Sequence, residues 1–273
     1  MIVFPNAKIN IGLNITEKRP DGFHNLETVF FPVGWCDALE FVVADDLHFS
    51  SSGLLISGDQ ESNLVMKAYR LLQKDFSLPP LKIHLLKAIP SGAGLGGGSS
   101  DAAFMLSMLN EQFGLNLSED ELEVYATRLG SDCPFFIRNM PAFASGRGEI
   151  MEPVQPALNG LFILLVKPPV EVSTAKAFQW VVPEKSGNSL KTLIQLPVQE
   201  WKDQVVNQFE SSVFKQYPEI GELKKRLYDS GAVYASMSGS GSCVFGLFHE
   251  LPLGWNSLFP SSFLTFSQKL SIL

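Results

Sequence analysis

The sequence contains the stretch Pro90-Ser91-Gly92-Ala93-Gly94-Leu95-Gly96-Gly97-Gly98-Ser99-Ser100, called here the glycine-rich loop (residues 90–100). Glycine loses more conformational freedom on folding than any other residue, so this composition is costly unless the backbone must turn sharply or approach a ligand. Apolar residues at helical spacing follow, which predicts a helix that Ser99 or Ser100 caps and Gly114 ends. A loop of this kind directs N–H groups and a helix dipole at one place, which predicts a phosphate site.

Other phosphate-binding motifs fit the glycine-rich loop less well. The P-loop motif requires a lysine before the final serine or threonine, and residues 98–100 read Gly-Ser-Ser. Gly92, Gly94 and Gly97 satisfy the dinucleotide-binding pattern G-x-G-x-x-G, but that motif requires a second parallel strand after its helix. The sequence instead continues into a capping box at residues 118–121, which predicts a second helix. A purely connecting loop would not need so many glycines.

Length and charge limit the class of protein. A chain of 273 residues fits two modest domains, and the formal charge of −7 without a basic run argues against nucleic acid as a partner. The three cysteines form neither a metal-binding spacing nor a disulfide framework, which suits a reducing cytoplasm. No signal peptide and no membrane span are expected from the residue pattern. We therefore expect a cytoplasmic protein.

Three further segments of the sequence carry residues that could form a site. Residues 7–15 alternate between apolar and polar, which predicts a half-buried strand with Lys8 and Asn10 on its polar face. This face could simply be solvated. Phe23 and His24 follow a turn cluster, and Asp132 would occupy the first position of a short helix capped by Ser131. A helix N-terminus is sufficient to explain such an aspartate without any catalytic role.

Short motifs in a fixed order resemble those of the GHMP kinases, the family of galactose, homoserine, mevalonate and phosphomevalonate kinases. They occupy residues 7–10, 19–24, 90–103, 130–136 and 236–241. The segment 19–24 resembles that of a member which phosphorylates a diphosphocytidyl alcohol in the non-mevalonate route to isoprenoid precursors. The resemblance implies an α+β fold in two domains. Residues 1–150 would form a domain like ribosomal protein S5 domain 2, and residues 151–273 a ferredoxin-like domain.

The resemblance also implies roles for individual residues. ATP would be held by the glycine-rich loop together with Gly239 and Ser240, and Mg²⁺ would be bound through phosphate oxygens and water, with no protein ligand assigned. Asp132 would deprotonate or orient the 2-hydroxyl of the substrate, and Lys8 would pair with it. The substrate would be bound by Asn10, Phe23, His24, Thr174 and Phe178.

In the substrate site implied by the resemblance, Phe23 would stack on cytosine and His24 would hydrogen-bond its edge. Phe178 would be the second aromatic residue, although packing in the core explains it as well. Two other functions remain open at this point. One is a GHMP kinase for homoserine or a mevalonate-type alcohol, and the other is a nucleotide sensor without catalysis. The sequence does not indicate the oligomeric state.

Overall fold

The computed structural model describes residues 1–56, 58–184 and 188–271. The chain forms two compact units, and each is assembled from separate segments. Unit 1 comprises Met1–Lys8, Pro32–Ser91 and Gly96–Met140; unit 2 comprises Ile9–Phe31, Gly92–Leu95 and Pro141–Leu273. These units are defined by contacts and are not continuous in sequence. They therefore do not test the predicted boundary between residues 150 and 151, which stays a prediction. The glycine-rich loop contributes residues to both.

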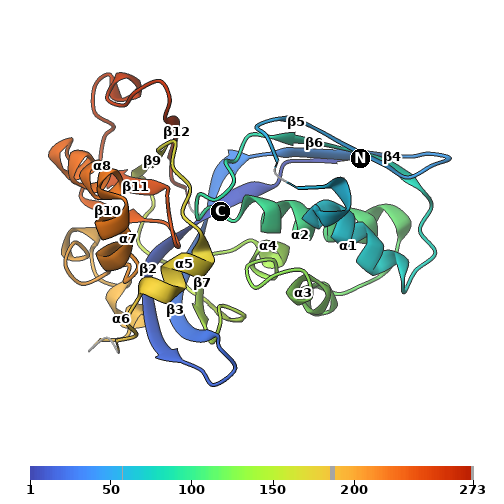
Figure 1. Cartoon of the computed structure of the whole chain (residues 1–273), viewed down its shortest axis with the longest axis horizontal. Coiled ribbons are helices and arrows are strands. Elements are labelled where there is room, and N and C mark those ends of the chain that lie inside the picture. The colour runs from blue at the N-terminus through green and yellow to red at the C-terminus, as the bar shows by residue number, and fades with distance from the viewer. Residues whose placement is uncertain (57, 185–187, 272–273) are drawn as a thin grey trace. The chain divides into compact units, whose positions relative to one another are not determined.

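Unit 1 contains a sheet with the strand order β1-β4-β6-β5, in which β4 and β6 are antiparallel and β5 and β6 are parallel. Its helices lie along one side of this sheet (Figure 1). Apolar residues from both layers form the core, among them Phe41, Ile83 and Leu106. The elements are β1 (Ile2–Val3), β4 (Ala38–Val43), β5 (His48–Gly53), η1 (Gln60–Ser62), α1 (Leu64–Gln73), β6 (Leu81–Lys87), α2 (Gly97–Phe113), α3 (Glu119–Thr127) and α4 (Phe135–Arg138).

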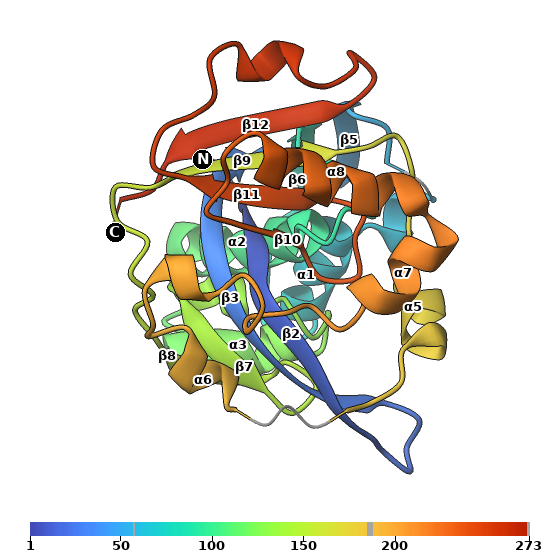
Figure 2. The same ribbon diagram turned by 90° about the vertical axis from the view of Figure 1, so that its left-hand side faces the viewer.

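Unit 2 contains a sheet with the strand order β10-β11-β9-β12, and α8 packs along β10 and β11 (Figure 2). The strands β2 and β3, which pass from one unit into the other along the chain, form a further sheet in the order β2-β3-β7-β8. The elements are β2 (Asn6–Lys18), β3 (His24–Cys36), β7 (Ala142–Ser145), β8 (Ile150–Pro153), β9 (Phe162–Lys167), α5 (Thr174–Trp180), α6 (Leu190–Leu193), η2 (Val198–Glu200), α7 (Glu210–Gln216), α8 (Pro218–Asp229), β10 (Tyr234–Met237), β11 (Val244–Phe248), η3 (Trp255–Ser257) and β12 (Leu264–Lys269).

The local helix predictions are largely confirmed. The helix after the glycine-rich loop is α2, and Gly114 ends it with φ +57°. The capping box at Ser118 is present at the start of α3. The predicted cap at Ser99 or Ser100 is wrong, because α2 already begins at Gly97 and the N–H of Ser100 donates to the carbonyl of Gly96. No helix in the described residues is long and apolar enough to cross a bilayer.

Two predictions about polar residues are wrong. The strand over residues 7–15 exists as β2, but every residue from Asn6 to Ile15 is buried. Its polar side chains are buried because they have polar partners, for example Thr28 for Asn10. Asp132 does not occupy the first position of a helix, since residues 131–134 form a turn and α4 begins only at Phe135.

A buried charge cluster fixes the start of α2 to the end of β6. Lys87 donates to Asp101 (2.8 Å) and to Asp37, and all three side chains are at most 4% exposed. Asp37 also accepts from the backbone N–H groups of Ala88 (2.6 Å) and Ile89 (2.8 Å). This cluster therefore holds the chain on both sides of the glycine-rich loop. Burial, reinforced by Asp37 and opposed by Lys87, raises the pKa of Asp101 to about 7.

We predict that Asp101→Asn flattens the dependence of stability on pH. With a pKa of about 7 when folded and 3.8 when exposed, Asp101 binds a proton between pH 4 and 7 only in the folded state. The free energy of unfolding therefore falls as pH rises through this window, by up to ~1 kcal/mol per pH unit from this group. Urea unfolding at pH 5, 6, 7 and 8 measures this slope, with Asp46→Asn at an exposed turn as control. A variant slope equal to that of the wild type would contradict the prediction.

Candidate active site

Unit 1 brings Lys8 and Asp132 together, as the resemblance implies. The Nζ atom of Lys8 lies 3.4 Å from Oδ2 of Asp132, and the exposed fractions of the two side chains are 4% and 37%. The lysine is thus a buried cation, and the aspartate is a carboxylate that a ligand can reach from solvent. Buried charges are retained where they are paired, and such pairs are frequent in functional sites.

Apolar anchors hold the turn that carries Asp132. Cys133, Phe135 and Phe136 are almost fully buried, and the N–H of Cys133 donates to the carbonyl of Gly130 (3.2 Å). Buried side chains on one side of a short turn direct its remaining residue outward. The sequence therefore places Asp132 at the surface of a rigid segment instead of on a mobile loop.

The start of α2 lies against the same lysine. A Cβ atom on Gly96 would lie 3.1 Å from Cγ and Cε of Lys8 and 3.0 Å from the ring of Phe136. Gly96 has φ +71°, a conformation that favours glycine. The N-terminus of a helix attracts anions, and here a buried ammonium group lies beside it. Lys8, Asp132 and the first turn of α2 thus form one cluster within unit 1.

Unit 2 holds the middle of the glycine-rich loop against residues 236–241, called here the serine-glycine loop. The hydroxyl of Ser238 donates to the carbonyl of Gly94 (2.8 Å) and accepts from the N–H of Asn10 (3.2 Å). A Cβ atom on Gly94 would lie only 1.9 Å from the carbonyl oxygen of Ser238. Close backbone contact is therefore possible only because residue 94 is glycine. The N–H of Cys243 also donates to the carbonyl of Ala93 (3.2 Å).

The other residues predicted for the phosphates differ in accessibility. Ser91, Gly92 and Gly98 are exposed, so a ligand can approach their backbone. The side chains of Ala93 and Leu95 are buried and anchor the middle of the loop. Further residues are wholly or partly buried, namely Pro90, Gly94, Gly96, Gly97, Ser99 and Ser100.

Asn10 and Thr174 lie beside the serine-glycine loop in unit 2. The amide of Asn10 donates to Thr28 (2.9 Å), and a Cβ atom on Gly239 would lie 3.2 Å from Oδ1 of Asn10. The hydroxyl of Thr174 lies 2.9 Å from that of Ser240. Asn10 and Thr174, both predicted for the substrate, are thus neighbours of the residues predicted for ATP.

An aromatic cluster forms at the start of β3. The rings of His24 and Phe178 are stacked, with centroids 5.0 Å apart and planes at 22°, and Phe178 also packs edge-on against Phe209 (4.9 Å). Phe23 is 53% exposed, and the guanidinium carbon of Arg147 lies 5.0 Å from its ring centroid. Phe178 therefore both joins the core and contacts His24.

The environment of His24 keeps its imidazole neutral near pH 7. Burial lowers its pKa from 6.5, and the positive charge of Lys18 lowers it further. A neutral imidazole offers one donor and one acceptor, which suits the edge of a nucleobase.

Sequence reasoning missed several residues of this arrangement. Ser238 joins the two loops, Arg147 covers Phe23, and the Asp37–Lys87–Asp101 cluster fixes the loop ends. Their partners are distant in sequence, so no local pattern marks them. For Ser238 the position inside the serine-glycine loop was the one available signal.

Comparison with known proteins identifies the family. The family model "GHMP kinases N terminal domain" matches residues 63–145, and the model "GHMP kinases C terminal" matches residues 189–253. The chain belongs to the GHMP kinases. It is 60% identical over 254 residues to the 4-diphosphocytidyl-2-C-methyl-D-erythritol kinase of Bacteroides fragilis, covering 91% of this chain and 92% of the relative. For the enzyme of the same name from Bacteroides thetaiotaomicron the identity is 62% over 252 residues, with the same coverage.

Solved GHMP kinase structures agree with this placement. A crystal structure of 4-(cytidine 5'-diphospho)-2C-methyl-D-erythritol kinase superposes with a TM-score of 0.78 at 32% identity and covers 90% of each chain. The mevalonate kinase of Methanococcus jannaschii has a TM-score of 0.73 at 12% identity, covering 99% of this chain and 98% of its own, and shares the fold alone. The α+β fold of the GHMP kinases is thereby confirmed, and the protein is a kinase that uses ATP to phosphorylate a small molecule.

In this kinase, we predict that Gly94→Ala weakens ATP binding by about 10-fold or more, because the loop must move to relieve the contact with Ser238. Gly231→Ala is the matched control in the same unit. Gly231 also has positive φ, +97°, but its Cβ would meet nothing within 4 Å. The control should lose ~1–2 kcal/mol of stability from backbone strain and keep its ATP affinity. Calorimetric titration with ATP measures the affinities, and equal values for the two variants would contradict the prediction.

Proposed function

We propose that this kinase transfers the γ-phosphoryl group of ATP to the 2-hydroxyl of 4-diphosphocytidyl-2-C-methyl-D-erythritol, a step of the non-mevalonate route to isoprenoid precursors. The observation that carries the proposal is the Lys8–Asp132 pair beside the first turn of α2. The names of the relatives that are 60% and 62% identical support the substrate.

Asp132 would act on the substrate hydroxyl. The hydroxyl oxygen attacks the γ-phosphorus, the bond to the β-γ bridging oxygen breaks, and ADP leaves with that electron pair. The hydroxyl proton passes to the carboxylate of Asp132, which also orients the attacking oxygen. The ammonium group of Lys8 balances the charge of the carboxylate and stabilises the negative charge that develops on the transferred phosphoryl group.

The phosphates of ATP would be bound by backbone N–H groups. Residues 91, 92 and 98 are exposed, so their backbone and the N-terminus of α2 provide such donors. By the family resemblance Gly239 and Ser240, which are buried in unit 2, would add further ones. Among the described residues no group of three His, Cys, Asp or Glu side chains could hold a metal ion. By the family resemblance Mg²⁺ would be carried mainly by phosphate oxygens and water, and we assign it no protein ligand.

The cytosine of the substrate would be recognised in the aromatic cluster. The stacked rings of His24 and Phe178 provide an apolar face beside a neutral imidazole. Phe23 is exposed enough to cover a base, and Arg147 holds its ring from one side. Homoserine or mevalonate would use no such aromatic surface, which disfavours those substrates. A sensor without catalysis would not need the Lys8–Asp132 pair.

We predict that Asp132→Asn lowers kcat by ~10²–10⁴-fold, since the amide cannot accept the hydroxyl proton. ATP affinity should change less than about 2-fold, because the substituted group does not bind the nucleotide phosphates in this mechanism. Asp45→Asn, at an exposed turn of unit 1, is the control and should keep full activity. An ADP-release assay measures kcat. Full turnover by Asp132→Asn would contradict the role of the carboxylate.

We predict that Phe178→Ala raises KM for the diphosphocytidyl substrate by about 10-fold, the loss expected for one base-stacking contact. KM for ATP should stay the same. Trp180→Ala, on the same helix and in contact with Tyr217, controls for the loss of an aromatic side chain from α5. Steady-state kinetics with each substrate varied in turn give both constants. If the two variants shift KM for the cytidyl substrate equally, Phe178 is only a core residue.

A further inference from the structure

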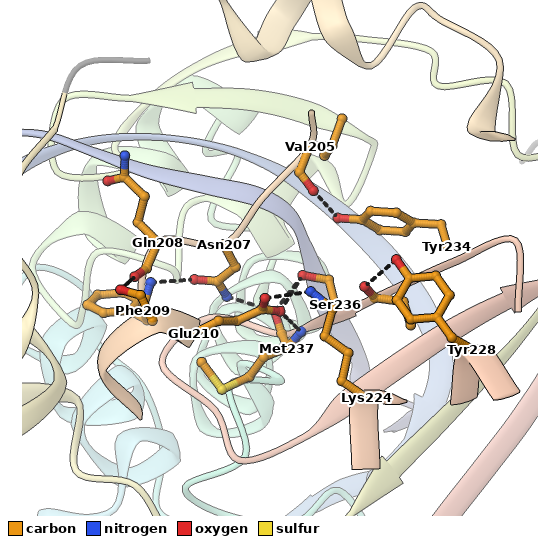
Figure 3. A network of polar contacts seen from close by, with 12 residues as sticks. Val205, Asn207, Gln208, Phe209, Glu210, Lys224, Tyr228, Tyr234, Ser236 and Met237 are labelled. Carbon is orange, nitrogen blue, oxygen red and sulfur yellow. Dashed lines mark hydrogen bonds and ion pairs between the residues drawn. The ribbon is translucent and has the colours of Figure 1, made fainter. Parts of the chain in front are cut away.

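Asn207 is a buried amide whose hydrogen bonds all go to backbone groups in unit 2. It is 2% exposed and lies between η2 and α7. Its Nδ2 group donates to the carbonyls of Met237 (2.7 Å) and Gly239 (2.8 Å), and its Oδ1 accepts from the N–H of Phe209 (3.0 Å). Figure 3 shows this side chain in the network that joins it to β10. Both of its donors therefore fix carbonyls of the serine-glycine loop.

The backbone at Asn207 is itself held against β2. The N–H of Leu13 donates to the carbonyl of Val206, and the N–H of Gln208 donates to the carbonyl of Leu13, both at 2.8 Å. The side chain of Gln208 accepts from the N–H of Ile15 (2.6 Å). Asn207 is thus attached to the strand that also carries Asn10, and it can transmit the position of that strand to the loop.

Glu210 binds the start of the serine-glycine loop, at Ser236 and Met237. Its Oε1 atom accepts from the N–H of Met237 (2.8 Å) and from the hydroxyl of Ser236 (3.1 Å), and its Oε2 atom pairs with Lys224 (2.5 Å) (Figure 3). The N–H and carbonyl of Met237 are therefore both bound by side chains of the segment 207–210. An ion pair with one partner on α8 keeps the carboxylate of Glu210 in place.

These contacts determine where the N–H groups of the serine-glycine loop point. In a trans peptide the carbonyl and the following N–H point in opposite directions. At Met237 this geometry is visible, since its carbonyl accepts from Asn207 while the N–H of Ser238 donates to Cys243 (2.9 Å). At Gly239 the carbonyl also points to Asn207, so the N–H of Ser240 is directed to the opposite side. This peptide is the central one of a turn that the N–H of Gly241 closes by donating to the carbonyl of Ser238 (2.9 Å), and Gly239 has φ +55°, a conformation that favours glycine.

We propose that Asn207 is a positioning residue for ATP, which fixes the Gly239–Ser240 peptide so that its N–H is aligned for a phosphate oxygen before the nucleotide binds. Glu210 supports it by fixing Met237. A donor that is already oriented loses no freedom when ATP binds, so the arrangement favours affinity and catalysis. The inference rests on the proposed role of Gly239 and Ser240 in binding ATP.

The test compares Asn207→Asp and Asn207→Ala with the control Asn110→Ala in the full-length protein. Asn207→Asp keeps the shape and the acceptor but loses both donors. Asn110 is a partly buried amide near the C-terminal end of α2 in unit 1, where it bonds the backbone of Leu117. We expect both Asn207 variants to raise the Kd of a non-hydrolysable ATP analogue by about 10-fold and to raise KM for ATP similarly. The Kd of the diphosphocytidyl substrate should change less than 2-fold.

A purely structural role would give a different pattern. If the Asn207 variants only lower the melting temperature, as Asn110→Ala should, and bind the ATP analogue like the wild type, the inference is wrong. An equal loss of affinity for both ligands would also overturn it. Should neither variant fold, Asn207→Ser replaces them, because a hydroxyl has one proton and can donate to only one of the two carbonyls. An unchanged Kd for the analogue in Asn207→Ser would then overturn the inference.

One more variant separates this inference from the proposed function. Gly239→Ala distorts the serine-glycine loop directly, because its Cβ would lie 3.2 Å from Asn10 and 3.4 Å from Gly94. If Gly239→Ala weakens binding of the ATP analogue and the Asn207 variants do not, the loop binds ATP but Asn207 does not position it. If neither changes the affinity, the assignment of Gly239 and Ser240 to ATP fails as well.

Discussion

Close approach of the backbone at glycine residues is the constraint on which the glycine-rich loop depends in each of the two units. In unit 2 the backbone of Gly94 touches that of Ser238, and in unit 1 Gly96 and Gly97 lie against the side chains of Lys8 and Lys87. Any Cβ atom at these positions would overlap or crowd its neighbour. These glycines are therefore needed for packing, in addition to the phosphate binding that we propose for the loop.

The charged groups divide into those that hold the loop and those that can reach a ligand. Lys87 with Asp37 and Asp101 is fully enclosed and joins β6 to α2, whereas Asp132 is one-third exposed beside the buried Lys8. A buried ion pair is weak support for stability, because desolvation offsets much of the attraction. In the mechanism that we propose, the Lys8–Asp132 pair is kept in spite of this cost because the reaction needs a fixed cation next to the carboxylate.

Local patterns in the sequence predicted those features of the fold that interactions between neighbouring residues determine. The glycine-rich loop, the helix that Gly114 ends and the capping box at Ser118 follow from neighbouring residues alone. The burial of Lys8 could not be read from the alternation of β2, because a charged partner of the lysine, Asp132, is more than 120 residues away. The pairing of Lys8 with Asp132 came from the order of the family motifs, because the spacing of residues along the chain does not indicate it.

Partners that are distant in sequence also explain why three residues of unit 2 were not predicted. Asn207, Glu210 and Ser238 act through backbone groups that no residue pattern identifies, and their partners come from other elements of the fold. Phe178 could be read as core or as site, and the structure shows that it contacts both the core and His24. Side chains that position a loop are thus less visible in sequence than the loop itself.

The most direct test of the central claim is a phosphorus NMR measurement of the product. The kinase is incubated with ATP and Mg²⁺ and, in separate reactions, with 4-diphosphocytidyl-2-C-methyl-D-erythritol, mevalonate or homoserine. The account predicts ADP and one new phosphomonoester signal, assigned to the 2-position, with the cytidyl substrate alone. A phosphomonoester formed from mevalonate or homoserine instead, or no product from any of the three despite ATP binding, would contradict it.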